Sequence, residues 1–166
     1  MLGTVSGRVW KFGDNINSDL IHPSRFFSLD KNTVRRGAMK GIDPDFTENV
    51  KEGDIIVAGR NFGCGSGRET AVISLMLNGI SVVVAESFAR MFYRNAINLS
   101  LPVIKCRGIS EKVSEGDTLE IDLDKAIILN LDSHEEIKAE DIPEHLKSIL
   151  EKDGLMNLLS QDHKII

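Results

Sequence analysis

The chain has 166 residues, of which 42% are hydrophobic and 27% charged, a composition typical of one globular domain that builds its own core. Its formal net charge of −5 argues against non-specific binding to nucleic acid, which depends on a basic surface. The sequence shows no signal-peptide pattern at its start and no apolar stretch of membrane-spanning length, and two cysteines are too few for a disulfide framework. We therefore expect a cytoplasmic protein that binds neither membrane nor nucleic acid.

The first third of the chain contains one predicted strand and a long segment without regular periodicity. Residues 7–12 (GRVWKF) alternate in polarity and end at a Gly-Asp-Asn turn, which predicts a short strand. Residues 17–49 follow neither a helical nor a strand period and contain prolines and glycines, which is typical of a functional loop or a disordered one. We expect residues 26–46 to be mobile, as loops that carry specificity often are.

The middle of the chain alternates predicted strands and helices. Residues 68–77 predict a helix that ends at an Asn-Gly pair, and residues 87–100 predict a second helix with Ser87 as its N-cap. Three apolar runs flank these helices and predict buried strands: residues 55–58, 80–86 and 102–106. Strand, helix, strand, helix, strand indicates a parallel α/β core with right-handed crossovers.

Past residue 108 the pattern changes to that of an antiparallel sheet. Residues 116–123 and 125–131 alternate around an Asp-Lys turn, and residues 142–159 predict one closing helix. The fold class predicted from the residues is α/β. We expect one domain over residues 1–166, a mixed β/α sandwich with a parallel α/β core and antiparallel C-terminal strands.

The stretch NFGCGSGRETAVISLML, residues 61–77, places three glycines directly before a helix. Glycine allows a positive φ and a close approach to a ligand, and a helix N-terminus offers unpaired N–H groups, so the stretch predicts an anion site. Gly63 and Gly65, with Glu86 downstream, partly match a dinucleotide fingerprint, but Arg68 stands where the third glycine belongs. The Gly-Lys-Ser/Thr ending of a P-loop is missing. A glycine turn without a ligand, or a nucleotide- or phosphate-binding regulatory module, stays open at this point.

Ser66 and Arg68 favour a small carboxylic acid over a phosphate. The planar guanidinium of Arg68 suits bidentate binding of a carboxylate. Ser66 lies between two glycines, on a loop that can push its oxygen into a cleft, but the G-x-S-x-G spacing of the hydrolase nucleophile elbow is not met.

Three sequence blocks carry a resemblance to a known family. They are GDNINSDLIHPSRF (13–26), NFGCGSGRE (61–69) and ESFARMFYRNAINLSLPVI (86–104), and the similarity covers roughly residues 7–106. In this order the blocks resemble the small subunits of 3-isopropylmalate dehydratase (isopropylmalate isomerase), a branch of the aconitase superfamily.

That resemblance implies a swivelling β/β/α domain that is active only with a separate large subunit, which holds a [4Fe-4S] cluster. It also implies a hydro-lyase that isomerises 2-isopropylmalate and 3-isopropylmalate by dehydration and rehydration, in leucine biosynthesis. Small subunits of related dehydratases, of the homoaconitase, citramalate or 2,3-dimethylmalate type, stay open as alternatives.

The resemblance assigns roles to residues of the glycine loop. Ser66 matches the serine that removes the proton α to a carboxylate, and Arg68 matches the arginine that binds a substrate carboxylate. Gly65 and Gly67 would bring the serine oxygen and backbone N–H groups up to a small dicarboxylic acid. Two positions depart from the family: Gly67 replaces a serine that contacts the substrate, and Thr70 replaces a histidine.

The upstream block supplies further candidates. Asp19 matches a family aspartate that supports the active-site network, although it could also be a simple turn residue before Pro23. Ser18 occupies a family threonine position beside it and is a candidate substrate contact. His22 is tempting as an acid–base group, but relatives carry an apolar or small residue there.

Substrate choice in this family is attributed to the loop that begins PSRFFSL. Relatives that accept an extra carboxylate carry an arginine at the position of Ser28. Phe26, Phe27 and Leu29 therefore suit an alkyl substituent such as isopropyl, unless the two phenylalanines simply belong to the core.

The chain is not expected to bind a metal itself. A cubane cluster with one iron left open needs about three protein thiolates, and Cys64 and Cys106 are only two. The four histidines show no metal-ligand spacing. The cluster is therefore expected in the large subunit.

Overall fold

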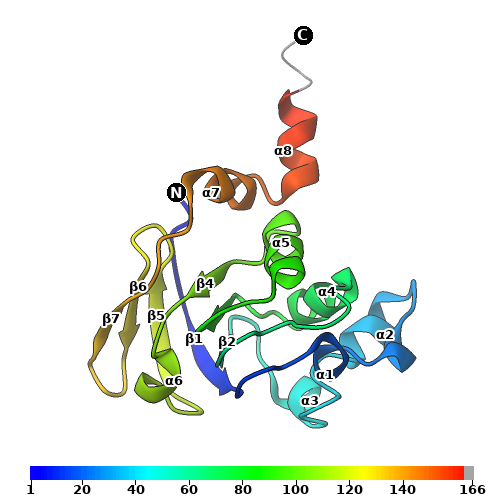
Figure 1. The fold of residues 1–166 in the computed structure, drawn as a ribbon, viewed down its shortest axis with the longest axis horizontal. Coiled ribbons are helices and arrows are strands. Elements are labelled where there is room, and N and C mark those ends of the chain that lie inside the picture. The colour runs from blue at the N-terminus through cyan, green and yellow to red at the C-terminus, as the bar shows by residue number, and fades with distance from the viewer. Residues whose placement is uncertain (163–166) are drawn as a thin grey trace.

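One seven-stranded sheet, in the order β4-β3-β2-β1-β5-β6-β7, organises the fold (Figure 1). The computed structural model of the chain describes residues 1–162. Four strands pair in parallel: β1 (Thr4–Lys11), β2 (Ile55–Ala58), β3 (Val82–Ala85) and β4 (Val103–Lys105). Three strands continue the sheet antiparallel from β1: β5 (Thr118–Asp122), β6 (Ile127–Asn130) and β7 (Glu136–Lys138). The predicted α/β class, with a parallel core and antiparallel C-terminal strands, is confirmed.

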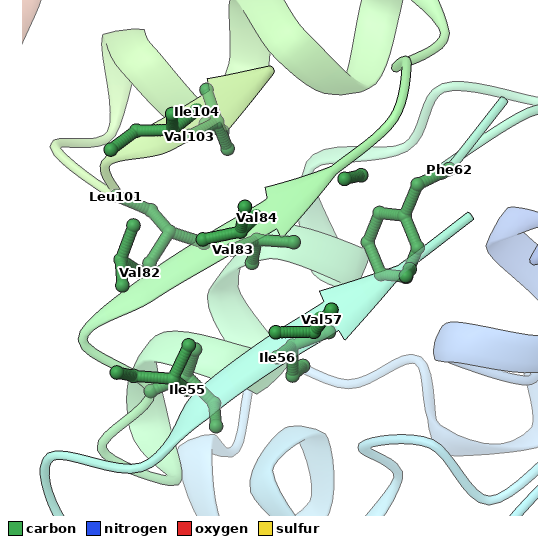
Figure 2. Packing of buried hydrophobic residues seen from close by; sticks show 14 of the residues in the cluster. Ile55, Ile56, Val57, Phe62, Val82, Val83, Val84, Leu101, Val103 and Ile104 are labelled. Atoms are coloured by element: carbon green, nitrogen blue, oxygen red, sulfur yellow. The ribbon is translucent and has the colours of Figure 1, made fainter. Parts of the chain in front are cut away.

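The parallel half of the sheet contains the centre of the core. All four residues of β2 and all four of β3 are buried, and Ile55 pairs with Val82 to set the register. Figure 2 shows the branched side chains of both strands close to those of β4 and to Phe62. A parallel sheet is covered on both faces, which is why these strands read as continuous apolar runs.

Helices α4 (Glu69–Leu77) and α5 (Arg90–Asn98) form the crossovers between the parallel strands. The predicted helix at 68–77 is confirmed, including its end at Asn78. The N-cap prediction for Ser87 is wrong, because the residue before α5 is Ala89. Ser87 lies outside the helix because its neighbour Phe88 pairs with Phe62 as a parallel bridge, and the Ser87 hydroxyl instead accepts the N–H of Asn61 at 2.8 Å.

Short helices replace the loop that was expected over residues 17–49. The three α-helices among them each bury at least one side chain, and Figure 1 shows these helices on the same side of the molecule as α4. Helices of one or two turns are too short to give a periodic signal. They are α1 (Ser18–Ile21), the 3-10 helix η1 (Ser24–Phe26), α2 (Lys31–Arg36) and α3 (Phe46–Asn49). Mobility of residues 26–46 stays a prediction.

The C-terminal region ends in two helices instead of one. Helix α7 (Glu144–Glu151) packs near α5, and α8 (Leu155–Asp162) projects away from the sheet (Figure 1). Gly154 interrupts them with φ at +110°, and a Cβ there would lie 2.7 Å from the carbonyl oxygen of Asn98. The short helix α6 (Ile109–Lys112) and β7 were not predicted. Residues 163–166 of the predicted domain lie outside the described residues.

Candidate active site

The glycine loop connects the end of β2 to the start of α4, as the sequence predicted. Gly65 has φ at +102°, and a Cβ on it would lie 3.1 Å from the hydroxyl oxygen of Ser18. A side chain at this position would therefore both strain the backbone and crowd α1. The missing side chain lets the loop approach α1 closely.

Ser18 and Ser66, which are 48 residues apart in the chain, are joined by hydrogen bonds. Their hydroxyl oxygens are 3.0 Å apart, and the Ser66 N–H donates to the Ser18 hydroxyl oxygen at 3.2 Å. The Ser18 N–H donates to the carbonyl of Cys64 at 2.8 Å. These bonds fix two predicted site residues, one from each sequence block, against each other.

Arg68 and Asp19 form an ion pair at the same place. Their side chains are 35% and 73% exposed, so the pair is expected to contribute about 0–1 kcal/mol to stability. The guanidinium carbon of Arg68 also lies 4.2 Å from the centre of the Phe27 ring. Because the pairing is weak and half-open to solvent, a ligand carboxylate can compete for the guanidinium.

The substrate loop contributes its residues unevenly. Phe26 is half-buried and Phe27 is 37% exposed, so the alternative that both belong to the core is not supported. Leu29 is fully exposed. The exposed Ser28 accepts the N–H of Asp30 at 3.0 Å, within its own loop, and Phe27 is the residue that reaches Arg68.

A comparison with protein families matches residues 14–107 to the aconitase C-terminal domain. The chain belongs to this family. The matched range contains the glycine loop, α1 and the substrate loop, and therefore every candidate site residue described above.

Similarity to individual relatives extends over nearly the whole chain. The isopropylmalate/citramalate isomerase small subunit of Methanocaldococcus jannaschii is 52% identical, over 97% of this chain and 96% of that protein. The 3-isopropylmalate dehydratase small subunit 1 of Thermotoga maritima is 46% identical, over 95% of each. A crystal structure of 3-isopropylmalate dehydratase from Methanocaldococcus jannaschii superposes with a TM-score of 0.93 at 44% identity, over 98% of this chain and 96% of that one. The resemblance to the small subunits of this aconitase-superfamily branch is confirmed.

The structure explains why a glycine occupies position 67 in this chain. Its φ is +63°, and a Cβ on it would lie 2.6 Å from the Cβ of Met91. The Gly67 carbonyl accepts the side-chain N–H of Asn95 at 2.7 Å. Sequence reasoning missed both partners on α5, because a glycine signals a close approach without naming the neighbour.

Glu86, which suggested a dinucleotide site, and Arg68, which stands where its third glycine belongs, both make other contacts in the structure. The Glu86 carboxylate accepts the N–H of Gly108 at 2.9 Å, and Arg68 is paired with Asp19. The hydroxyl of Thr70, which replaces the family histidine, is buried and has no hydrogen-bond partner among residues 1–162. Nothing in this arrangement favours the nucleotide-binding alternative.

Both cysteines are free. Cys64 is partly exposed in the glycine loop, whereas Cys106 is buried, and burial raises the pKa of its thiol. Within residues 1–162, no group of three or more His, Cys, Asp or Glu side chains could hold a metal ion. No helix in that range has the length and apolar character needed to cross a membrane.

The site is an open surface, and a separate cavity lies elsewhere. A cavity of about 700 Å³ is lined by residues from β1, its following turn and α6, and its lining does not include Ser66 or Arg68. Some of its lining residues are Trp10, Lys11, Asp14, Arg60 and Glu111. This cavity therefore does not mark the candidate catalytic groups, which lie where α1 meets the glycine loop.

Proposed function

We propose that this chain is the small subunit of a hydro-lyase that isomerises 2-isopropylmalate and 3-isopropylmalate by dehydration and rehydration, as in leucine biosynthesis. The observation that carries the proposal is the contact between two sequence blocks. Ser66 lies against Ser18, and Arg68 lies against Asp19, so a hydroxyl and a carboxylate-binding fork occur side by side. Such a pair suits proton removal next to a carboxylate.

In this proposal Ser66 removes the proton from the carbon α to a carboxylate, and water leaves from the neighbouring carbon. A serine hydroxyl is a weak base, so its oxygen needs stabilisation by cationic and N–H groups nearby. Arg68 supplies positive charge, and the Ser18 hydroxyl can donate a hydrogen bond to the Ser66 oxygen, since either hydroxyl can be the donor. Rehydration with the opposite regiochemistry gives the isomer.

The reaction requires a Lewis acid for the leaving hydroxyl, which an open iron of a [4Fe-4S] cluster supplies when bound. The residues of this chain do not fit that cluster. Cys106 is buried and Cys64 is the other thiol, and three thiolates are needed. We therefore assign the cluster to a large subunit that docks over the glycine loop.

The exposure of the site supports the need for that partner. Ser66 and Asp19 are exposed in the chain alone, where water would compete for every polar contact. Electrostatic stabilisation of a developing charge is most effective where water is excluded. A large subunit that covers α1 and the glycine loop would close the site.

The substrate loop favours an alkyl substituent on the malate. Phe27 presents apolar surface beside Arg68, Leu29 is fully exposed nearby in the chain, and each buried methyl would contribute about 0.8 kcal/mol. Citramalate is a second candidate substrate, because the relative that is 52% identical is named an isopropylmalate/citramalate isomerase small subunit. A methyl group fits the same apolar surface with less burial.

The proposal is tested by reconstitution with a cluster-bearing large subunit of this family. We expect a complex that consumes 3-isopropylmalate and shows the ultraviolet absorbance of the dehydrated alkene, with slower turnover of citramalate. The matched control is the complex with Ser66→Ala, which should assemble and lose most of its activity. A stable complex with an intact cluster that dehydrates neither acid would contradict the proposal.

A further inference from the structure

His22 is the buried end of a row of contacts that leads to Arg68. Its side chain is fully buried, and its Nε2 atom lies 3.0 Å from the carbonyl oxygen of Val34 in α2. The imidazole ring stacks on the ring of Phe27, with centroids 5.6 Å apart and planes 17° apart. The guanidinium carbon of Arg68 in turn lies over the Phe27 ring, 4.2 Å from its centre. The row therefore runs from α2, through two stacked rings, to the group that would bind a substrate carboxylate.

The packing around His22 fixes its ring in place. A Cβ on Gly37 would lie 2.6 Å from the His22 Nε2 atom and 2.5 Å from the Cβ of Phe26. Glycine at position 37 therefore leaves room for the imidazole beside the end of α2. Since a carbonyl accepts, the contact with Val34 places the ring proton on Nε2.

The other ring nitrogen shows that His22 is not an ordinary core residue. Its Nδ1 atom is buried and has no hydrogen-bond partner within the described part of the chain. An unpaired buried acceptor costs free energy that a leucine or phenylalanine would not. The imidazole donates its one N–H to the Val34 carbonyl in α2, and its flat face stacks on the Phe27 ring. An apolar side chain cannot make both contacts.

We propose that His22 is a positioning residue, which sets the location of the Arg68 guanidinium by orienting the ring of Phe27. The expected effect on substrate affinity rests on the proposed function, whereas the expected effect on the location of the Arg68 guanidinium does not. Asp19 holds one side of the guanidinium through a weak exposed ion pair, and the Phe27 ring supports its face. Substrate affinity therefore depends on the stacked rings, and stability depends on the hydrogen bond to Val34.

Two variants separate those dependences. His22→Phe keeps the aromatic ring and removes the donor to Val34, whereas His22→Gln keeps an N–H donor and removes the ring. In the reconstituted enzyme, His22→Gln is expected to raise KM about three- to tenfold with kcat within twofold. His22→Phe is expected to lower Tm and leave KM near the wild-type value. Phe27→Leu should raise KM as His22→Gln does, and the double variant should not add to it, because both act along one row.

A second readout does not need the large subunit. In the isolated chain the Nε–H resonance of Arg68 experiences the ring current of Phe27, so its NMR chemical shift reports the geometry of that contact. We expect His22→Gln and Phe27→Leu to move this resonance and His22→Phe to leave it nearly unchanged. This result holds or fails whether or not the complex turns over isopropylmalate, so the two proposals can fail separately.

The proposal is overturned if His22→Gln lowers Tm while both KM and the Arg68 resonance stay at wild-type values, since His22 would then be a packing residue only. If the His22→Gln chain does not fold, Gly37→Ala supplies the same test. The added methyl pushes against the intact His22 ring from the side of α2. An Arg68 resonance unmoved by that displacement overturns the proposal equally.

Discussion

The parallel core and the segment of short helices reach their structures in different ways. In β2 and β3 every side chain is buried, and the strands pair in a register that branched apolar residues fill on both faces. Residues 17–49 instead hold their short helices through a few scattered buried side chains such as Ile21, Val34 and Phe46. The candidate catalytic groups lie where these two regions meet, with Ser66 and Arg68 from the core side and Ser18 and Asp19 from the segment. One region provides rigidity, and the other provides surface that a substrate and a partner can contact.

The largest expected effect is a loss of catalytic rate at that junction, with stability nearly unchanged. Ser66→Ala in the reconstituted enzyme should lower kcat by about 10²–10⁴-fold, because the lost oxygen acts in the proton-transfer step. Substrate affinity should change little. Stability should stay near wild type, since Ser66 is exposed and its hydroxyl bonds only to Ser18 among the described residues. Steady-state kinetics and a melting curve on the same sample check both statements.

Arg68→Lys is the matched control for the Ser66 variant. A lysine keeps the charge but cannot make the two-pronged contact with a carboxylate, so KM should rise more than kcat falls. If Ser66→Ala retained activity within about threefold of wild type, the glycine loop would be a turn without a catalytic base.

A second prediction compares one phenylalanine from each region. Phe62 is fully buried against Phe88 and Phe92, so Phe62→Ala should lower the free energy of unfolding by about 3–5 kcal/mol. Phe27 is 37% exposed, and Phe27→Ala should cost about 1 kcal/mol. Denaturant unfolding of the isolated chain measures both. Equal losses would mean that side chains of the segment of short helices are packed as tightly as those of the core, which would contradict the difference between the two regions.

This difference also explains which features the sequence could predict. The apolar runs IIVA and VVVA identify buried parallel strands without any knowledge of their neighbours. The glycine motif likewise predicts an anion site from local residues, whereas the roles of Ser66 and Arg68 come from the resemblance to the family and stay predictions. Both signals are contained in a few consecutive residues.

The missed features depend on contacts between distant residues. Helices of one or two turns over residues 17–49 give no period, and the contacts of the Phe27 ring with His22 and Arg68 depend on a pairing that no local pattern encodes. The capping role predicted for Ser87 fails for the same reason, since the strand-like pairing of Phe88 keeps the chain extended. Local propensity was overridden there by the isolated bridge between Phe62 and Phe88.

A third prediction concerns the position where this chain departs from its family. Gly67→Ser should lower the free energy of unfolding by about 1–3 kcal/mol, because the positive φ is strained for serine and its Cβ meets Met91. The cost should be smaller when measured in a Met91→Gly background, which removes the clashing atoms. A double-mutant cycle by denaturant unfolding gives this coupling, with Met91→Gly alone as the reference. Additive losses would show that backbone strain alone excludes serine.

The smallest expected effect is a dependence of stability on pH that belongs to the segment of short helices. Burial is the main cause that lowers the pKa of His22 below the usual 6.5, and the charge of Arg68 adds to it, although the contact with Val34 opposes both. In the unfolded chain the same ring takes up a proton at about pH 6.5. Below that pH the unfolded state binds more protons, so stability rises with pH and is lost as pH falls.

The contribution of His22 is fully present above about pH 6.5, declines as the pH falls through the folded pKa, and levels off below it. One titrating group limits the slope to about 1.4 kcal/mol per pH unit. Hydrogen bonds from Thr33 lower the pKa of carboxyl groups such as Asp30, which therefore stay charged in the folded chain between about pH 6.5 and 5, and the difference between wild type and His22→Phe in this range reports the histidine. Unfolding curves of wild type and His22→Phe at several pH values in this range measure the difference. We expect the variant to lose the acid-side slope, and an unchanged slope would show that another group causes it.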